Sequence, residues 1–282
     1  MKIVAIVITY NPDKDLLKRQ NDSLKTQVDD IIYVDNSSSN RDVIDSVLSA
    51  NAFVVYNYEN AGLAKAQNQG IELAGKSGAD FVILFDQDSV PPSNFVNGLL
   101  SCYEKQSLTE KVALVGPVIK NRTTDNYSYK GVVFNGFSIK RVEVGSATEV
   151  SYCIASGSLI PLKVLNDVGG LKDFLFIDGL DVEWCLRAKK KGYKIFQTNN
   201  TFLDHQIGDG SLERIKSHSI RREYYIIRNS IWMAKQGYVP CGYRMRKIFS
   251  TLGRLLLSIK NFDLEYFKAE LKGLYDGIRL CS

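Results

Sequence analysis

The chain lacks the features that mark several large classes of protein. Its 282 residues include five cysteines, an odd number with no C-x-x-C pair, at Cys102, Cys153, Cys185, Cys241 and Cys281. This pattern argues against a disulfide framework or a structural zinc site and fits a reducing cytoplasm. No stretch reaches the roughly 20 apolar residues of a membrane-spanning helix. The first apolar run is too short for a signal peptide, so we expect a buried strand there.

Nucleic-acid-binding modules and Gly-rich phosphate loops are also not expected. No recognised DNA- or RNA-binding motif is present, so we expect no nucleic acid partner. We expect no phosphate loop of the G-x-G-x-x-G or G-x-x-x-x-G-K-[ST] kind, which counts against a nucleotide-binding or nucleotidyl-transfer protein built on the same sheet.

Positive charge is concentrated towards the C-terminal end. The net charge is +5, but residues 211–282 hold 14 Lys and Arg against 6 Asp and Glu, a net charge of +8. One interpretation is a solvated helical face. The other is a negatively charged partner, either an anionic membrane surface or a diphosphate substrate. The composition leaves both open.

Short apolar runs alternate with helical patterns through the first half of the chain. This alternation predicts βαβ units, and therefore an α/β fold with a Rossmann-like, mostly parallel sheet flanked by helices. The predicted strands are Ile3–Ile8, Ile31–Val34, Phe53–Tyr56, Phe81–Phe85 and Val112–Val115, and the predicted helices cover about 14–28, 41–50, 62–76 and 93–105.

The second half of the chain follows a different pattern. Short mixed or antiparallel strands are expected at 120–160, and a helix is expected from Asp181 to Lys191, closed by Gly192. Two or three helices should fill 215–280. We therefore expect a nucleotide-binding and catalytic domain at residues 1–215 and a helical, basic C-terminal extension at 216–282.

Polar side chains follow three of the predicted strands. The strands end in Thr9-Tyr10-Asn11, in Asp35-Asn36-Ser37 and in Asp86-Gln87-Asp88. Each group alone is also typical of a turn or a helix cap. Ligands of open α/β sheets bind beyond the carboxyl ends of the strands, so the three groups together predict one crevice. Mg²⁺ and Mn²⁺ take one or two carboxylates plus substrate phosphates, and Asp86-x-Asp88 can supply them.

These motifs and several later ones resemble the family 2 glycosyltransferases of GT-A fold. The likeness covers about residues 1–230, and its last motifs resemble bacterial rhamnosyltransferases. The motifs are Ile8-Thr9-Tyr10-Asn11, Val34-Asp35-Asn36, Asn60-x-Gly62-x-Ala64-x-Ala66-x-Asn68-x-Gly70, Asp86-x-Asp88, Ala155-Ser156-Gly157, Phe176-Ile177-Asp178-x-x-Asp181-Val182-Glu183-Trp184-Cys185-Leu186-Arg187, His205-Gln206-Ile207-Gly208 and Arg222-x-Tyr224-Tyr225-x-x-Arg228-Asn229.

The resemblance implies roles for individual residues on the donor side. Asp88 would bind a Mn²⁺ or Mg²⁺ ion that bridges the diphosphate, and His205 would complete the metal site, since imidazole is a competent Mn²⁺ ligand. A structural or solvent-facing role for His205 is the alternative. The residues that would contact the nucleotide are Thr9, Tyr10, Asn11, Asp35, Asn60, Lys65 and Asp86, although Lys65 fits a surface lysine equally well.

A second acidic cluster follows Phe176, which we expect to be buried. Asp181 matches the family's catalytic base, with Glu183 and Asp178 as alternatives, while a plain helix N-cap would explain Asp181 without catalysis. Arg187 lies four residues after Glu183, where an ion pair is expected. The resemblance adds Glu183, Trp184 and Arg187 to the substrate-binding residues.

The activity implied is an inverting glycosyl transfer from a nucleotide-diphospho-sugar. The donor would be dTDP-L-rhamnose, and the acceptor a hydroxyl of a growing glycan such as O-antigen or capsule, with a polyprenyl-diphosphate-linked acceptor as one form. Transfer of galactose, glucose or N-acetylglucosamine is an alternative, as is a nucleotidyl-transfer protein or an inactive glycan-binding subunit.

The helical stretch Tyr243–Lys260 is amphipathic. Its apolar residues recur at helical spacing, and most of its basic residues lie elsewhere on the helical wheel. The stretch could pack on the catalytic domain, or it could meet anionic lipid near a lipid-linked acceptor. The expected location is accordingly the cytoplasm, either free or on the inner face of the plasma membrane.

Overall fold

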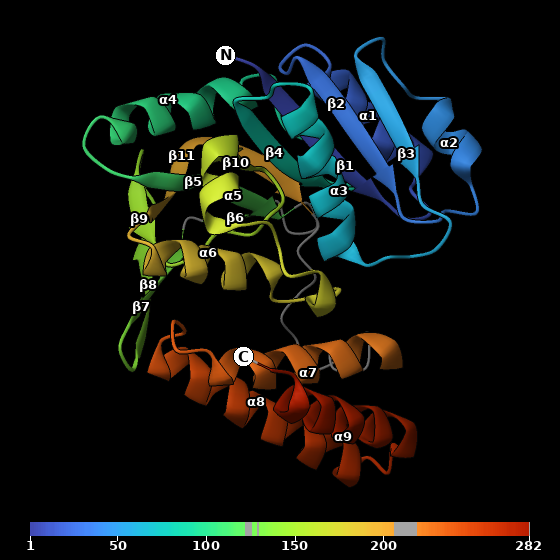
Figure 1. The fold of residues 1–282 in the computed structure, drawn as a ribbon, viewed down its shortest axis with the longest axis vertical. Helices are drawn as coiled ribbons and strands as arrows, with labels where there is room; N and C mark the ends of the chain where they lie inside the picture. The colour runs from blue at the N-terminus through green and yellow to red at the C-terminus, as the bar shows by residue number, and fades with distance from the viewer. Residues whose placement is uncertain (122–125, 129, 206–218, 282) are drawn as a thin grey trace.

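A central sheet covered by helices on both faces forms most of the molecule, and three C-terminal helices form a further layer (Figure 1). The computed structural model describes residues 1–121, 126–128, 130–205 and 219–281. Among these residues, no helix is both long and apolar enough to cross a bilayer.

The first half of the chain forms the parallel part of the sheet. Its strands are β1 (Ile3–Thr9), β2 (Asp30–Asp35), β3 (Ala52–Tyr56) and β4 (Phe81–Asp86), which lie in the order β3-β2-β1-β4 and pair in parallel throughout. Because helices cross over between them, successive strands run in the same direction. The helices are α1 (Lys14–Leu24), α2 (Arg41–Asp45) and α3 (Leu63–Lys76). All these predicted elements are confirmed, although α1 and α2 end four and five residues early, each in a tight turn.

The second half of the chain completes the sheet with mixed pairing. The full order is β3-β2-β1-β4-β10-β5-β11-β9, with β6 paired to β5 beside this path. The antiparallel strands expected at 120–160 are confirmed. The strands are β5 (Val112–Asn121), β6 (Asn126–Ser128), β7 (Lys130–Asn135), β8 (Ser138–Glu143), β9 (Thr148–Val150), β10 (Ser158–Pro161) and β11 (Lys194–His205), and β7 and β8 form a separate hairpin.

Two hydrophobic cores lie on opposite faces of the sheet. Side chains alternate along a strand, so Ile3, Ala5 and Val7 of β1 face one core, while Val4 and Ile6 face the other. Helices α1, α2 and α4 (Phe95–Ser107) cover the first core. Helices α3, α5 (Leu162–Val168) and α6 (Leu180–Lys190) cover the second, and a short 3-10 turn, η1 (Asp173–Leu175), precedes α6.

The C-terminal helices pack against the second core. They are α7 (Ile220–Lys235), α8 (Cys241–Lys260) and α9 (Leu264–Arg279). Trp232 and Met233 of α7 and Tyr243 of α8 belong to that core, so this layer is tied to the α/β part by buried apolar contacts. The expected boundary between residues 215 and 216 falls outside the described residues and stays a prediction.

One stretch of α3 has the G-x-x-x-x-G-K-[ST] spacing of a phosphate loop, although the sequence analysis expected no such loop. Gly70–Ser77 reads G-x-x-x-x-G-K-S. A phosphate loop binds with free backbone N–H groups between a strand and a helix. Here Gly70 to Lys76 lie within the helix and Ser77 is its C-cap, so the backbone N–H groups of this stretch are taken up by the helix. The pattern is present, but the phosphate loop is not.

Candidate active site

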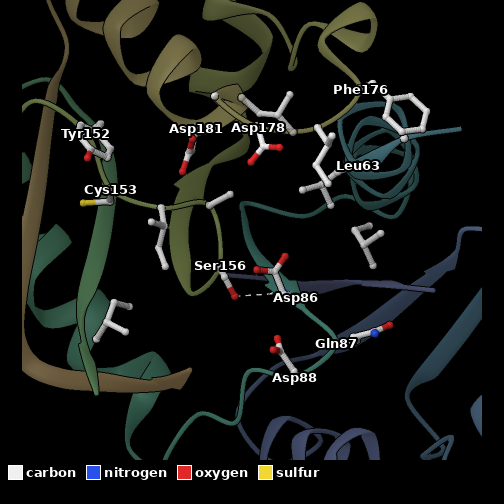
Figure 2. Close-up of a pocket in the computed structure, with 18 of the residues that line it drawn as sticks. Leu63, Asp86, Gln87, Asp88, Tyr152, Cys153, Ser156, Phe176, Asp178 and Asp181 are labelled. Atoms are coloured by element: carbon white, nitrogen blue, oxygen red, sulfur yellow. Dashed lines mark hydrogen bonds between the residues drawn. The ribbon is translucent and has the colours of Figure 1, made fainter. Parts of the chain in front are cut away.

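A cavity of about 1050 Å³ opens beyond the carboxyl ends of β1 and β4. Its walls come from the turns after these strands, from the loop before α6 and from the start of α7. This is the edge at which open α/β sheets bind ligands, because the strand-to-helix turns meet there. Figure 2 shows four carboxylates in this cavity, Asp86 and Asp88 on one side and Asp178 and Asp181 on the other.

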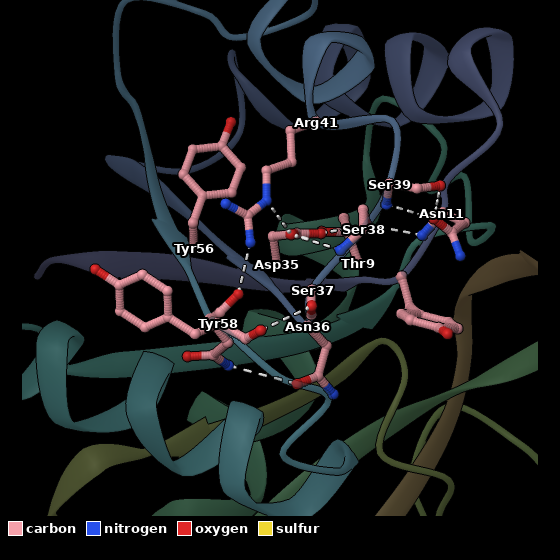
Figure 3. Close-up of polar contacts among 12 residues, drawn as sticks. Thr9, Asn11, Asp35, Asn36, Ser37, Ser38, Ser39, Arg41, Tyr56 and Tyr58 are labelled. Carbon is pink, nitrogen blue, oxygen red and sulfur yellow. Dashed lines mark hydrogen bonds and ion pairs between the residues drawn. The ribbon is translucent and has the colours of Figure 1, made fainter.

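The turn after β2 is organised by the fully buried Asp35 (Figure 3). Its carboxylate accepts hydrogen bonds from Thr9 Oγ1 at 3.0 Å and from the Ser38 backbone N–H at 2.9 Å, and Arg41 Nε lies 3.6 Å away. A buried carboxylate needs such donors, since an unpaired one would be costly. Asp35 therefore joins the end of β1 to the turn after β2, and it does not line the cavity itself.

The neighbouring turn residues differ in how far they reach the cavity. Thr9 and the half-exposed Tyr10 line it. Asn11 instead adopts a left-handed conformation, with φ 49°, and its side-chain oxygen accepts from the Ser39 N–H at 2.8 Å. Of the predicted nucleotide contacts in this region, Thr9 and Tyr10 lie in the cavity, while Asn11 and Asp35 hold the loops around it.

The turn before α3 contributes Asn60 to the cavity. Its side-chain oxygen accepts from Asn36 Nδ2 at 3.1 Å and from the Gly62 N–H at 3.0 Å. Gly62 has φ 87°, and a Cβ there would lie 2.4 Å from the ring of Phe176, so the turn requires glycine. Lys65 is exposed on α3 outside the cavity.

The turn after β4 is held rigidly. Gln20 Nε2 donates to the backbone oxygens of Asp86 at 2.7 Å and Ser89 at 2.6 Å. The Asp86 N–H donates to Ser156 Oγ at 3.1 Å. The backbone is thus fixed from two sides, and the carboxylates of Asp86 and Asp88 point into the cavity.

Asp181 faces this turn from the first turn of α6. Burial raises its pKa to about 6, and the negative charges of Asp178 and Asp86 add to the rise, while N–H donors such as that of Val182, 2.8 Å from Oδ1, oppose it. Asp178 is instead paired with Arg222, whose Nε and Nη2 donate to its two oxygens at 2.9 and 2.8 Å.

Three residues of α6 that were expected to bind substrate also lie outside the cavity. Glu183 is fully buried and accepts from Arg187 Nε at 2.8 Å and from the hydroxyl of Tyr238 at 2.6 Å. Trp184 is also buried, and its Nε1 donates to Gly169 O at 2.8 Å. Each helical residue turns by about 100°, so these side chains face the core when Asp181 faces the cavity. The expected ion pair is confirmed, but these contacts are internal to the protein.

The donor groups present fit a cation that is completed by substrate. Among the described residues, no three His, Cys, Asp or Glu side chains gather as a metal site. One or two carboxylates plus diphosphate oxygens is the usual Mg²⁺ arrangement, and Asp88 and Asp86 are placed for it. The side chain of His205 lies outside the described residues, so its metal role stays a prediction.

The structure adds cavity residues to which the sequence had assigned no role. Arg222, Phe176 and Ser156 all line the cavity. Each stands in a motif that carried the family resemblance, so the motifs were the available signal. Sequence spacing alone could not bring them together, because they lie on three separate elements.

Comparison with known proteins identifies the family. The model of the family "Glycosyl transferase family 2" matches residues 4–169. The dTDP-rhamnosyl transferase RfbF of Shigella flexneri is 31% identical over 288 aligned residues, which cover 98% of this chain and 95% of that protein. The chain belongs to glycosyltransferase family 2.

More distant relatives agree with this assignment. A Methanococcus voltae enzyme, dolichyl N-acetyl-alpha-D-glucosaminyl phosphate 3-beta-D-2,3-diacetamido-2,3-dideoxy-beta-D-glucuronosyltransferase, is 25% identical over 85% of this chain and 79% of its own. The structure of S. aureus TarS 1-349 in complex with UDP-GlcNAc superposes with a TM-score of 0.61 at 17% identity, over 99% of this chain and 81% of that one. GalNAc-T7 with UDP, GalNAc and Mn²⁺ gives 0.60 at 14% identity over 88% of this chain, which spans about half (54%) of that structure. These structures show the fold, and the GT-A expectation is confirmed.

The raised pKa of Asp181 predicts a stability cost for this family 2 glycosyltransferase. The folded carboxyl, with a pKa of about 6 against an ordinary 3.8, binds its proton more tightly than the unfolded one. Folding stability therefore falls as pH rises between these values. Replacing Asp181 by Asn removes the buried charge, so we expect a higher Tm than wild type at pH 7.5 and a smaller difference at pH 4.5, measured by thermal unfolding.

A matched control is Asp167→Asn. The Lys191 ammonium holds the pKa of the exposed Asp167 carboxyl below its usual value, so this variant should gain no stability at pH 7.5. Equal Tm values for wild type and Asp181→Asn at pH 7.5 would contradict the burial argument.

Proposed function

We propose that this enzyme transfers L-rhamnose from dTDP-L-rhamnose to a hydroxyl of a growing, polyprenyl-diphosphate-linked glycan of the cell surface, such as O-antigen or capsule. The observation that carries the donor is the near-full-length likeness, at 31% identity, to a protein named dTDP-rhamnosyl transferase. The two acidic pairs on opposite sides of one cavity support the reaction type.

The proposed chemistry is a single inverting displacement. The acceptor oxygen attacks the anomeric carbon from the face opposite the diphosphate, the glycosidic bond forms, and the bond to the diphosphate breaks with its electrons leaving on dTDP. Asp181 takes the hydroxyl proton. A base with a pKa near 6 is largely deprotonated at neutral pH, and yet it binds a proton better than an ordinary carboxylate.

The other residues of the cavity bind and orient. Thr9, Tyr10 and Asn60, which line the cavity, would contact the nucleoside, and Asp88 would hold a Mn²⁺ or Mg²⁺ ion. Such an ion neutralises charge on the leaving group. Holding donor and acceptor in line supplies much of the remaining rate enhancement.

The donor is tested by product analysis with a panel of nucleotide sugars. We expect transfer from dTDP-L-rhamnose and little from the UDP forms of galactose, glucose or N-acetylglucosamine, with each product identified by mass spectrometry. EDTA should abolish transfer and added Mn²⁺ or Mg²⁺ should restore it. Transfer from a UDP-sugar alone would replace the rhamnosyl assignment, and full activity in chelator would refute the metal.

The base is tested by Asp181→Asn, which keeps the shape of the side chain and removes proton acceptance. We expect kcat to fall by roughly 10²–10⁴, the usual contribution of a general base, with dTDP affinity unchanged in calorimetry. In the wild type, kcat/KM should decrease as pH falls through about 6, because the free enzyme's Asp181 becomes protonated there. A normal rate for Asp181→Asn, with Asp178→Asn inactive, would move the role to Asp178.

Because the proposed acceptor is linked to a lipid, the enzyme would work at a membrane surface. Helix α8 packs inward through Thr251, Leu255 and Ser258, which are buried. The same helix exposes an apolar stripe, defined by Met245, Phe249, Leu252, Leu256 and Ile259. One face of the helix therefore packs on the molecule, and the other face is the one that we propose meets lipid.

Charge favours an anionic bilayer as the occupant of this stripe. Between Cys241 and Phe262 the chain holds five basic residues and no acidic one. A second copy packed two-fold on the stripe would bring like charges together. A bilayer rich in anionic lipid would instead attract them while burying the apolar side chains.

Vesicle flotation tests this placement. We expect binding to vesicles that contain phosphatidylglycerol, weakened by high salt and absent on pure phosphatidylcholine, and lost in the double variant Phe249→Ser/Leu256→Ser. Leu108→Ser is the matched control, since Leu108 is an exposed apolar residue just after α4, remote from the stripe. No flotation at low salt, or a dimer that the double variant disrupts, would exclude the lipid surface.

A further inference from the structure

The segment that precedes α6 has an unusual backbone. Phe176 adopts φ 64° and ψ −62°, and Asp178 adopts φ 65°. Side chains other than glycine rarely occupy positive φ, and such conformations persist only where the surrounding structure holds them. Asp181 stands three residues later, after Gly179 at φ 84°. The conformation of this segment therefore sets where the carboxylates of Asp178 and Asp181 lie.

One buried side chain of α7 holds this segment. Asn229 is 2% exposed, and its Nδ2 donates to the backbone oxygens of Leu175 at 2.9 Å, Ile177 at 2.7 Å and Asp178 at 2.9 Å. An amide has two N–H bonds, so one is shared between two carbonyls. A single amide thus binds three carbonyl groups of the strained segment, of which Leu175 O also accepts from the Ile177 N–H at 2.7 Å.

The orientation of that amide is fixed by its neighbour on α7. Arg228 donates to Asn229 Oδ1 from Nε at 3.1 Å and from Nη2 at 2.9 Å, and Nη2 also donates to Phe174 O. With the oxygen turned towards the guanidinium, the NH₂ group must face the segment. Aspartate at this position would offer no donor to the carbonyls.

Aromatic contacts also fix the segment before α6 against α7. The ring of Phe176 stacks on Tyr225 with centroids 4.6 Å apart and planes 8° from parallel. The guanidinium of Arg221 lies 4.8 Å from the centre of the same ring. Stacked rings and cation–π contacts both favour this placement of Phe176.

The same segment also contacts the start of α3, on the side of the cavity where the nucleotide sugar would bind under the proposed function. Phe176 O accepts from the N–H groups of Leu63 at 2.7 Å and Ala64 at 3.3 Å, at the start of α3. The ring of Phe176 fills the space beside Gly62. These contacts do not involve Asn229, so the donor side retains its own support when the amide is removed.

We propose that Asn229 is a positioning residue of this glycosyltransferase. It touches no substrate. By holding residues 175–178 it fixes the start of α6, and with it the acceptor-side carboxylates, so that a helix outside the α/β sheet determines the alignment of the reaction. The inference rests on the proposed function in taking Asp181 as the base.

The test compares Asn229→Ala with Gln236→Ala. Gln236 is also a buried amide at the end of α7, but its Nε2 bonds to Trp232 O of the same helix. Both variants lose a buried amide, and both should lower the Tm. We expect Asn229→Ala to lower kcat by about tenfold to a hundredfold, the cost of a misplaced reacting group, with the dissociation constant of dTDP unchanged. Gln236→Ala should keep its kcat per folded molecule.

The outcomes separate this inference from the proposed function. Normal kcat in Asn229→Ala, with Asp181→Asn inactive, would overturn the positioning role and leave the base in place. Equal losses of kcat in both amide variants would also overturn it, since the effect would then be general destabilisation. If Asn229→Ala does not fold, the proposal is tested with Arg228→Met, which removes the group that orients the amide. A kcat of this variant equal to that of the wild type would refute the proposal.

Discussion

Repulsion among four carboxylates in one cavity is the constraint on which the rest of the site depends. Asp86, Asp88, Asp178 and Asp181 share a space that, under the proposed function, would also admit a negatively charged diphosphate. Opposite charge and burial resolve part of the conflict, because Arg222 pairs with Asp178 and Asp181 holds its proton more tightly than usual. In the proposed reaction the diphosphate would lie beside the strand-end pair, Asp86 and Asp88, and a divalent cation bound there would add positive charge.

Two rigid supports keep these carboxylates apart. Gln20 and Ser156 fix the backbone of the turn after β4, and both belong to the α/β part of the molecule. The start of α6 is fixed instead from α7, through Asn229 and Arg222. Since Trp232 and Met233 of α7 also belong to the second core, the C-terminal helices are a structural part of the site. They cannot be treated as a passive appendage.

Sequence reasoning succeeded where the signal was local. Apolar runs and the polar residues that end them predict strands and a crevice, because strand direction alone brings the ends of β1 and β4 together. It assigned substrate contacts to Glu183, Trp184 and Arg187, which lie outside the cavity, since a run of polar and aromatic residues on a helix does not say which of them faces the cavity. It gave no role to Arg222 and Asn229, whose partners lie 44 to 54 residues away and are joined by contacts that spacing cannot reveal.

The segment that carries Asp178 and Asp181 contains features that destabilise the fold. Contacts around the segment offset this loss of stability. A partly desolvated Asp181 and two residues at positive φ all oppose folding. Around them lie buried groups with saturated hydrogen bonding: Glu183 between Arg187 and Tyr238, and Asn229 on its three carbonyls. A buried polar network of this kind is worth little unless it is fully satisfied, and then it specifies one geometry. In the proposed reaction the base must lie in line with the departing diphosphate, so the geometry that this network fixes is the one that the mechanism would require.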